Sequence, residues 1–91
     1  MIPSCRDKET EKVFRGLLSR RFQRIQDRAE ERLVQLHAAM SLMDLSIASM
    51  RLEKLSGDRR GQYSIRINAQ YRICFEWRNG NAYEVEIVDY H

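Results

Sequence analysis

The second half of the chain carries polar residues whose side chains could act together on a phosphodiester. An arginine stabilises the negative charge that develops on a phosphate during cleavage, while a glutamate or a histidine can accept or donate a proton. These residues also have a purely structural interpretation. Arg72 and Glu86, for example, could form a cross-strand ion pair, worth about 0.2–1 kcal/mol. Periodicity alone favours that structural interpretation. The candidates for chemistry are Glu53, Arg66, Arg72, Asp89, Tyr90 and His91.

Three segments of alternating apolar residues are expected to position these groups. They run over residues 63–67, 71–77 and 83–87, separated by short connectors at 68–70 and 79–80. Short connectors of this kind join antiparallel strands, so the pattern predicts a three-stranded meander. Successive side chains of a strand point to opposite faces. The predicted buried face consists of Tyr63, Ile65, Ile67, Tyr71, Ile73, Phe75, Trp77, Tyr83, Val85 and Ile87, and the polar face carries Arg66, Arg72, Glu84 and Glu86.

The turn of the second hairpin can be placed by the residues that it would bring opposite each other. A two-residue type I′ turn at residues 79–80 would set Phe75 opposite Glu84, an apolar residue against a charged one. A three-residue loop over residues 78–80 sets Phe75 opposite Tyr83 instead, and we therefore expect this loop. If the turn is type I′ after all, a bulge must lie elsewhere in the pair.

Two amphipathic helices are predicted before these strands. Asp7 is suited to cap the start of the first helix. The second runs from about Phe22 to Met40, because apolar residues recur there at three- and four-residue steps. The predicted core residues are Val13, Phe14, Leu17 and Leu18 on the first helix, and Phe22, Ile25, Ala29, Leu33, Leu36 and Met40 on the second.

Two further strands complete the predicted fold. Residues 1–5 could form an edge strand, where Pro3 is tolerated, and residues 50–55 could form a strand before the meander. The order is then strand, helix, helix and four strands. It predicts a single α+β domain over residues 1–91, with both helices packed on one face of a mainly antiparallel sheet.

Composition limits the class of protein. The chain has 91 residues, of which 43% are hydrophobic and 32% charged, as in soluble globular domains. No apolar run approaches the length of a membrane span, so we expect a cytoplasmic protein without membrane contact. The sequence contains neither metal-ligand spacing nor a phosphate-binding glycine loop, and we expect no cofactor. Cys5 and Cys74 are expected to be free thiols.

The net charge of +3 is unevenly distributed along the chain. Residues 1–56 contain 11 Lys and Arg against 8 Asp and Glu, whereas residues 57–91 contain 5 of each. Six arginines fall between Arg15 and Arg32. For any one of them a solvated helix face is the simpler interpretation, but the cluster would suit a polyanion such as RNA.

The C-terminal half resembles a known family. The run LEKLSGDRRGQYSIRIN at residues 52–68, followed by YRI at 71–73 and VDYH at 88–91, closely resembles the HigB branch of the RelE-type toxins. The similarity extends over essentially the whole chain, and the combination of GDRRGQYSIRIN with the terminal DYH is its most specific part.

This resemblance implies the toxin of a bacterial toxin–antitoxin pair that cuts messenger RNA in the decoding site of the ribosome. Family members use no metal or other cofactor. The 2′-hydroxyl of the messenger attacks the adjacent phosphate and leaves a cyclic phosphate end. The resemblance also implies a small helix-turn-helix antitoxin of the HigA type, and contact with operator DNA only through the toxin–antitoxin complex.

Site residues follow from the resemblance by position. Arg72 matches the arginine that stabilises the phosphate, and residues 89–91 match the C-terminal catalytic cluster, in which His91 is the best candidate for the general acid. Glu53 stands where some relatives carry a histidine and a sister branch carries a glutamate that acts as base. Whether Glu53 or His91 is the base stays open. Contacts to the RNA backbone or the ribosome are expected from Lys54, Arg59, Arg60 and Arg66.

Two other functions compete with cleavage of messenger RNA. A toxin of the same fold could poison DNA gyrase, as the ParE branch does, although that branch lacks the terminal acid–base cluster. A non-catalytic module could bind only RNA or an antitoxin.

Overall fold

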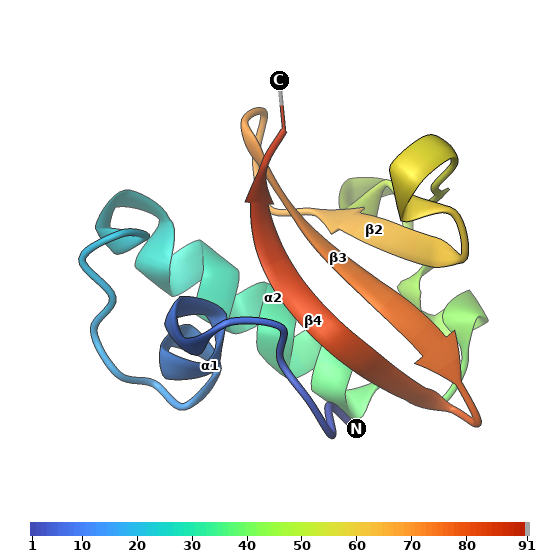
Figure 1. Cartoon of the computed structure of the whole chain (residues 1–91), viewed down its shortest axis with the longest axis horizontal. Helices are drawn as coiled ribbons and strands as arrows, with labels where there is room; N and C mark the ends of the chain where they lie inside the picture. The colour runs from blue at the N-terminus through green and yellow to red at the C-terminus, as the bar shows by residue number, and fades with distance from the viewer. Residues whose placement is uncertain (91) are drawn as a thin grey trace.

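The helices and strands follow one another in the order expected of an α+β fold. They are α1 (Lys8–Phe14), α2 (Gln26–Ala38), β1 (Glu53–Lys54), β2 (Gln62–Arg66), β3 (Tyr71–Arg78) and β4 (Asn81–Asp89). The computed structural model describes residues 1–90, and its sheet is antiparallel with the strand order β1-β2-β3-β4. Figure 1 shows α2 passing behind the long β3–β4 hairpin, with α1 beside it. The predicted fold class, two helices on a mainly antiparallel sheet, is confirmed.

Helix α1 is shorter than the apolar pattern suggests. Asp7 caps its start as predicted, because its carboxylate accepts a hydrogen bond of 2.6 Å from the Thr10 N–H. Gly16 adopts a left-handed backbone (φ 75°). The backbone N–H groups of Gly16 and Leu17 donate hydrogen bonds to the carbonyls of Val13 and Lys12 in the last turn. Leu17 and Leu18 therefore lie beyond the helix, and they are 50% and 66% exposed. Their prediction as core residues is wrong.

Helix α2 follows a short 3-10 turn at Gln23–Ile25 and ends at Ala38. The predicted core face is confirmed for Phe22, Ile25, Ala29, Leu33 and Leu36, all of which are buried. The prediction fails for Met40, which lies beyond the end of the helix and is 83% exposed.

The β3–β4 hairpin turns over two residues and not over the three that we expected. Asn79 and Gly80 both have positive φ (51° and 78°), as a type I′ turn requires. The extra residue lies in β4 instead, where Glu84 has φ 52° and the register shifts by one residue. This bulge restores apolar pairing beyond it, with Ile73 opposite Ile87.

The bulge also changes which residues of β4 face the core. Ala82, next to the turn, is fully buried opposite Trp77. Tyr83 pairs with Glu76, and its ring lies 4.1 Å from the guanidinium carbon of Arg78. The prediction that Tyr83 belongs to the buried face is therefore wrong.

The predicted pairing of Arg72 with Glu86 is wrong for the same reason. In the observed register Arg72 lies opposite Val88. Glu86 instead forms an ion pair of 3.1 Å with Arg59.

The N-terminal segment runs along the outer side of β4 but is not a strand. A single parallel bridge joins Cys5 to Val85, so the prediction of an edge strand over residues 1–5 is wrong. The Ser4 hydroxyl accepts a hydrogen bond of 3.0 Å from the N–H of the bulge residue Glu84. His37 holds the beginning of the segment, because its Nδ1 accepts a hydrogen bond from the Ile2 N–H at 3.1 Å.

The first strand of the sheet is also shorter than predicted. Only Glu53–Lys54 pairs with β2, because residues 48–50 form a 3-10 turn and Arg51 has a left-handed backbone (φ 45°). This turn brings the Arg51 carbonyl to the side chain of Arg72 on β3.

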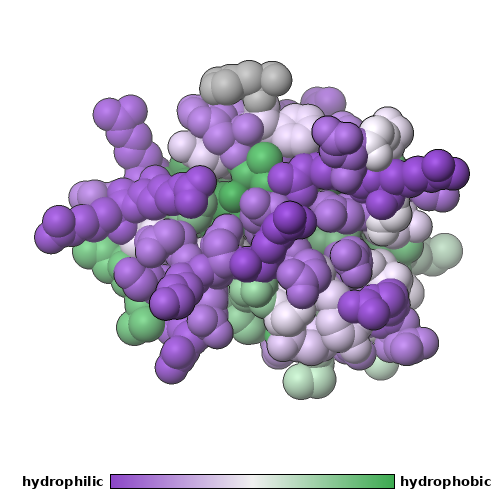
Figure 2. Space-filling model, in the orientation of Figure 1, coloured by the Kyte–Doolittle hydropathy of each residue, from purple (hydrophilic) through white to green (hydrophobic). Residues whose placement is uncertain are grey.

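The core lies between the sheet and the two helices. Its fully buried members include Val13, Leu33, Leu36, Ile65, Ile73, Phe75 and Val85. Outside this core, hydrophilic side chains cover most of the face drawn in Figure 2. No helix within residues 1–90 is long and apolar enough to cross a membrane.

Candidate active site on the polar face of the sheet

Arg72 is a buried charge at the centre of the polar face. The residue lies on β3 and is buried. The Nε group donates a hydrogen bond of 2.8 Å to the Ser64 hydroxyl, and Nη2 donates to the Arg51 carbonyl. A buried charge is tolerated where its donors are satisfied. These two acceptors therefore hold the guanidinium in one orientation.

Glu53 supplies a carboxylate beside this guanidinium. It lies on β1 opposite Ser64, so the strand pairing brings its Oε1 within 3.6 Å of Arg72 Nη1. The side chain of Glu53 is 54% exposed, whereas that of Arg72 is 9% exposed. The carboxylate can therefore meet a substrate from solvent while the arginine stays fixed.

Tyr90 closes the other side of Arg72. The centre of its ring lies 5.8 Å from the Arg72 guanidinium carbon. Its backbone N–H donates a hydrogen bond of 2.6 Å to the Gln70 carbonyl, which extends the pairing of β4 with the β2–β3 loop. Tyr90 is 39% exposed and so remains accessible.

These side chains enclose a shallow hollow of about 330 Å³, which we call the catalytic hollow. It gathers three arginines, one carboxylate and one phenol, a set that can bind a phosphate and accept a proton from a neighbouring hydroxyl. Four of the residues selected from the sequence therefore lie together. Its lining consists of Arg51, Glu53, Arg66, Asn68, Ala69, Arg72 and Tyr90.

Asp89, another C-terminal candidate, does not line the catalytic hollow. Asp89 is paired with Tyr71 across the hairpin and accepts a hydrogen bond of 3.1 Å from Gln70 Nε2. Because side chains alternate along a strand, this position belongs to the face opposite that of Tyr90. His91 lies outside the described residues.

The predicted RNA-binding residues of β1 and the following loop do not line the catalytic hollow. Lys54 and Arg60 are exposed. Arg59 spans β3, since its Nη1 lies 3.1 Å both from Gln62 Oε1 on β2 and from Glu86 Oε1 on β4. These contacts already occupy the guanidinium of Arg59.

Cys74 lies on the same face and is fully buried. Burial raises the pKa of its thiol, so the group stays protonated at neutral pH. Both cysteines are free thiols, as expected.

Three residues of the site were not predicted from the sequence: Arg51, Ser64 and Asn68. The strand alternation does place Ser64 on the polar face, yet only the register shows that it meets Arg72. For Arg51 no sequence signal exists, since a left-handed backbone (φ 45°, ψ 54°) is unusual for any residue with a side chain. Within residues 1–90, no three His, Cys, Asp or Glu side chains are grouped so that they could hold a metal ion.

Comparison with known proteins places this chain in a family. The sequence model for the HigB-like toxins, described as the RelE-like toxin HigB of type II toxin–antitoxin systems, matches residues 4–91. The chain is 38% identical to "Endoribonuclease HigB" of Proteus vulgaris over 65 residues, which cover 71% of each chain. It is 46% identical to "Toxin HigB-1" of Vibrio cholerae serotype O1 over 48 residues, 52% of this chain and 50% of that protein.

The fold is shared with a solved complex. The YoeB–YefM complex from Staphylococcus aureus matches with a TM-score of 0.61 at 17% sequence identity, covering 100% of this chain and 98% of the other. With the fold, the polar hollow and the family match over residues 4–91 together, the chain belongs to the HigB-like family of RelE-like toxins of type II toxin–antitoxin systems.

Proposed function

We propose that this toxin is a ribosome-dependent endoribonuclease that cleaves messenger RNA in the ribosomal A site without a metal ion. The observation that carries the proposal is the buried Arg72 guanidinium, held by Ser64 and the Arg51 carbonyl, beside the accessible carboxylate of Glu53. The relative from Proteus vulgaris is named an endoribonuclease, which supports the same class of reaction.

The reaction is an attack of the 2′-oxygen of the messenger on its own adjacent phosphorus. A base removes the 2′-hydroxyl proton, the new P–O bond closes a cyclic phosphate, and the bond to the 5′-oxygen breaks. That oxygen leaves with a proton from a general acid. Arg72 stabilises the extra negative charge on the phosphoryl oxygens, and because it is already oriented it needs no rearrangement to do so.

Glu53 is the candidate base and His91 the candidate acid, in the roles that family members imply. The alternative assignment exchanges them. Tyr90, against the guanidinium of Arg72, is placed to contact the phosphate or the leaving oxygen. Asp89, hydrogen-bonded to Gln70, would help to hold the end of β4 in position.

The shape of the site supports the proposed dependence on the ribosome. A shallow hollow of about 330 Å³ offers few walls against which a flexible RNA could be oriented. The ribosome would hold the messenger in a geometry in which the 2′-oxygen, phosphorus and leaving oxygen are aligned, and such alignment can supply about 7–11 kcal/mol of the barrier. Lys54, Arg60 and Arg66 are proposed to contact RNA backbone.

The proposed partners are the ribosome, its messenger and a cognate helix-turn-helix antitoxin of the HigA type. Operator DNA would be reached only through the toxin–antitoxin complex. The solved neighbour is itself a toxin–antitoxin complex, which supports an antitoxin partner. A protein that acts on translating ribosomes would work in the cytoplasm.

Purified ribosomes programmed with a defined message provide the test. We expect cleavage within the codon in the A site by the wild-type protein, and intact message with Arg72→Ala. A gyrase supercoiling assay runs in parallel. Inhibited supercoiling without cleavage would favour a gyrase poison, and the absence of both effects would favour a binding module.

A further inference from the structure

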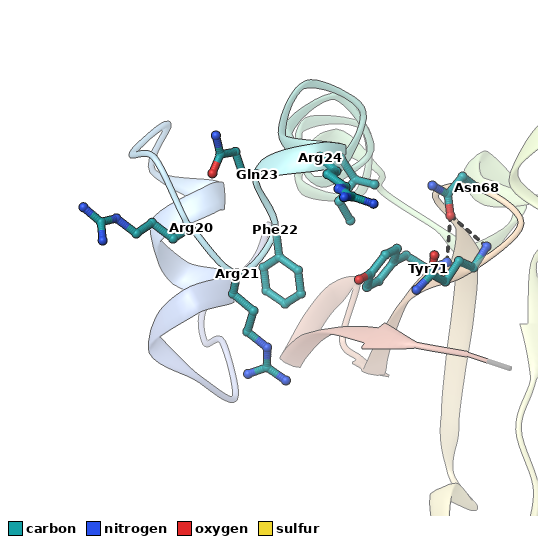
Figure 3. Close-up of a pocket in the computed structure, with 9 residues that line it drawn as sticks. Arg20, Arg21, Phe22, Gln23, Arg24, Asn68 and Tyr71 are labelled. Carbon is teal, nitrogen blue, oxygen red and sulfur yellow. Dashed lines mark hydrogen bonds between the residues drawn. The ribbon is translucent and has the colours of Figure 1, made fainter.

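A second and larger hollow lies next to the catalytic hollow and has no role in the mechanism above. Its volume is about 830 Å³, and it separates the turn that precedes α2 from the β2–β3 loop. Arg20, Arg21 and Arg24 line one side of it; in Figure 3 the side chain of Arg20 extends away from Asn68 and Tyr71, which line the opposite side. We call it the arginine hollow; its lining consists of Arg20, Arg21, Phe22, Gln23, Arg24, Ile25, Asn68, Gln70 and Tyr71.

The charge of this hollow is positive and largely uncompensated. No aspartate or glutamate is among its lining residues. Arg20 and Arg24 are exposed, and within residues 1–90 neither side chain forms an ion pair. Arg21 stacks over the ring of Phe22 at 5.3 Å. Two acids lie nearby. Asp89 accepts a hydrogen bond from Gln70 at the edge of the hollow, and the pKa of Glu9 is lowered by its hydrogen bond with Ser19 and, further, by the positive charges of Lys12 and Arg21.

The floor of the hollow is rigid. Phe22 is 3% exposed, and its ring meets that of Tyr71 edge to face at 6.1 Å. Asn68 Oδ1 accepts hydrogen bonds of 2.8 Å from the backbone N–H groups of both Gln70 and Tyr71, which Figure 3 marks as dashed lines. Such a side-chain turn fixes the loop before any ligand arrives.

Asn68 connects this hollow to the catalytic hollow, because it lines both. A third hollow of about 460 Å³ also includes Asn68, and it is lined by Arg28, Arg32, Arg51 and Arg66 without any acidic residue. The cationic surface therefore continues on both sides of the β2–β3 loop. A polyanionic strand that enters the catalytic hollow could follow this mainly positive surface, in which Glu53 and Asp89 are nearby acids.

We infer that the arginine hollow binds the phosphodiester backbone of the substrate RNA strand, outside the phosphate that is cleaved. This inference rests on the proposed endoribonuclease function. Guanidinium groups bind phosphates through forked pairs of hydrogen bonds, and arginines along one side of the hollow suit the backbone of a single strand. Contacts of this kind position the strand without selecting its sequence. An acidic antitoxin segment would also find positive charge here, but the shared wall at Asn68 favours a ligand that continues into the catalytic hollow.

The first measurement is binding of uncleavable RNA to the full chain at low salt, followed by fluorescence anisotropy. The probes are a 2′-O-methyl dinucleotide, which spans only the scissile position, and the same dinucleotide extended at both ends. We expect the extended RNA to bind more tightly. Equal affinities for the two RNAs would overturn the inference.

The second measurement uses a charge-neutralising pair and a matched control. Arg20→Gln/Arg24→Gln removes two exposed guanidinium groups that make no ion pair within residues 1–90, and should weaken binding of the extended RNA by roughly tenfold. The slope of log affinity against log salt should fall by about 0.7 for each lost phosphate contact on a single strand. Binding of the dinucleotide should not change. The control, Lys8→Gln/Arg15→Gln, removes two charges from positions that line none of the three hollows, and should behave like the wild-type protein.

Cleavage on programmed ribosomes separates this inference from the proposed function. The Arg20→Gln/Arg24→Gln variant should need more protein for half-maximal single-turnover cleavage but reach the wild-type maximal rate. If the wild-type protein does not cleave at all, the proposed function fails, while the length dependence of RNA binding still tests the hollow.

Three further results would overturn the inference. Equal losses in the variant and its control would indicate a non-specific charge effect. Unchanged RNA binding with weakened antitoxin binding would make the hollow a protein interface. Unchanged binding of the extended RNA with weakened ribosome binding would indicate ribosomal RNA as the ligand.

Discussion

Arg72 Nη1 lies 3.6 Å from Glu53 Oε1, but the two residues are held in different ways. The guanidinium is buried and is anchored by Ser64 and by the Arg51 carbonyl. The carboxylate is 54% exposed and makes this ion pair at the rim of the hollow. An ion pair with one exposed partner is worth about 1 kcal/mol or less. Glu53 can therefore exchange this contact for a substrate hydroxyl without disturbing the position of Arg72.

Replacing Arg72 tests the stabilisation of the phosphate. Arg72→Ala should lower the cleavage rate on programmed ribosomes by ~10²–10³ or more. It should also cost about 1–3 kcal/mol of unfolding free energy, because the buried Ser64 hydroxyl loses its partner. Single-turnover cleavage and urea unfolding measure the two effects.

Arg72→Lys is the matched control for that experiment, since it keeps the charge but not the forked geometry. We expect partial activity at most. Full toxicity of Arg72→Ala at equal expression would exclude the arginine from the reaction.

Replacing Glu53 tests the identity of the base. Glu53→Gln keeps the shape of the side chain and should lower the rate by roughly 10²–10⁴. Because the side chain is 54% exposed, the melting temperature should hardly change. The pH–rate profile should lose the rise in rate that accompanies deprotonation of the base. Near wild-type cleavage with an unaltered profile would transfer the role of base to His91.

Replacing His91 tests the general acid. His91→Gln should leave stability and antitoxin binding intact and should lower the rate by roughly 10²–10⁴. Single-turnover cleavage with a parallel melting curve provides the measurement. A normal rate would remove His91 from the mechanism, and a collapsed melting curve would indicate a structural role instead.

Dependence on the ribosome can be tested without any substitution. We expect the free protein to cleave a naked transcript far more slowly than the same message on ribosomes, because the catalytic hollow is shallow. Primer extension on both samples locates the cuts. Efficient cutting of the free transcript at the same codons would indicate a conventional ribonuclease.

The Cys5 thiol should make the fold sensitive to alkaline pH. Burial, together with the nearby carboxylates of Glu11, Asp7 and Glu84, raises the pKa of Cys5 from 9.0 to about 11. The folded state therefore holds this proton more tightly than the unfolded state does. The resulting stabilisation is fully present below pH 9.0 and is lost as the pH rises to about 11. Urea unfolding from pH 8 to 11 should show a smaller loss in Cys5→Ala; an equal loss in both proteins would contradict this assignment.

The sequence by itself determined the local elements of this protein. Alternation over residues 63–67 and 71–77 predicts two of the strands, and the three- and four-residue steps from Phe22 to Leu36 predict the buried face of α2. The cap at Asp7 could also be predicted, because its hydrogen bond reaches only to Thr10. Each of these signals depends on neighbours that are close along the chain.

Only the tertiary structure decided how the elements are aligned and what they enclose. The type I′ turn at residues 79–80 would set apolar residues opposite charged ones, and the bulge at Glu84 shifts the register by one residue and corrects this. A prediction that considers the turn without the bulge therefore selects the wrong register. The burial of Arg72 depends on Ser64 from a neighbouring strand and on the carbonyl of Arg51, which a left-handed backbone turns towards it. Ser64 and Arg51 precede Arg72 by 8 and 21 positions in the sequence. Strand pairing and reversal of the chain bring them to Arg72, so no local sequence pattern indicates these contacts.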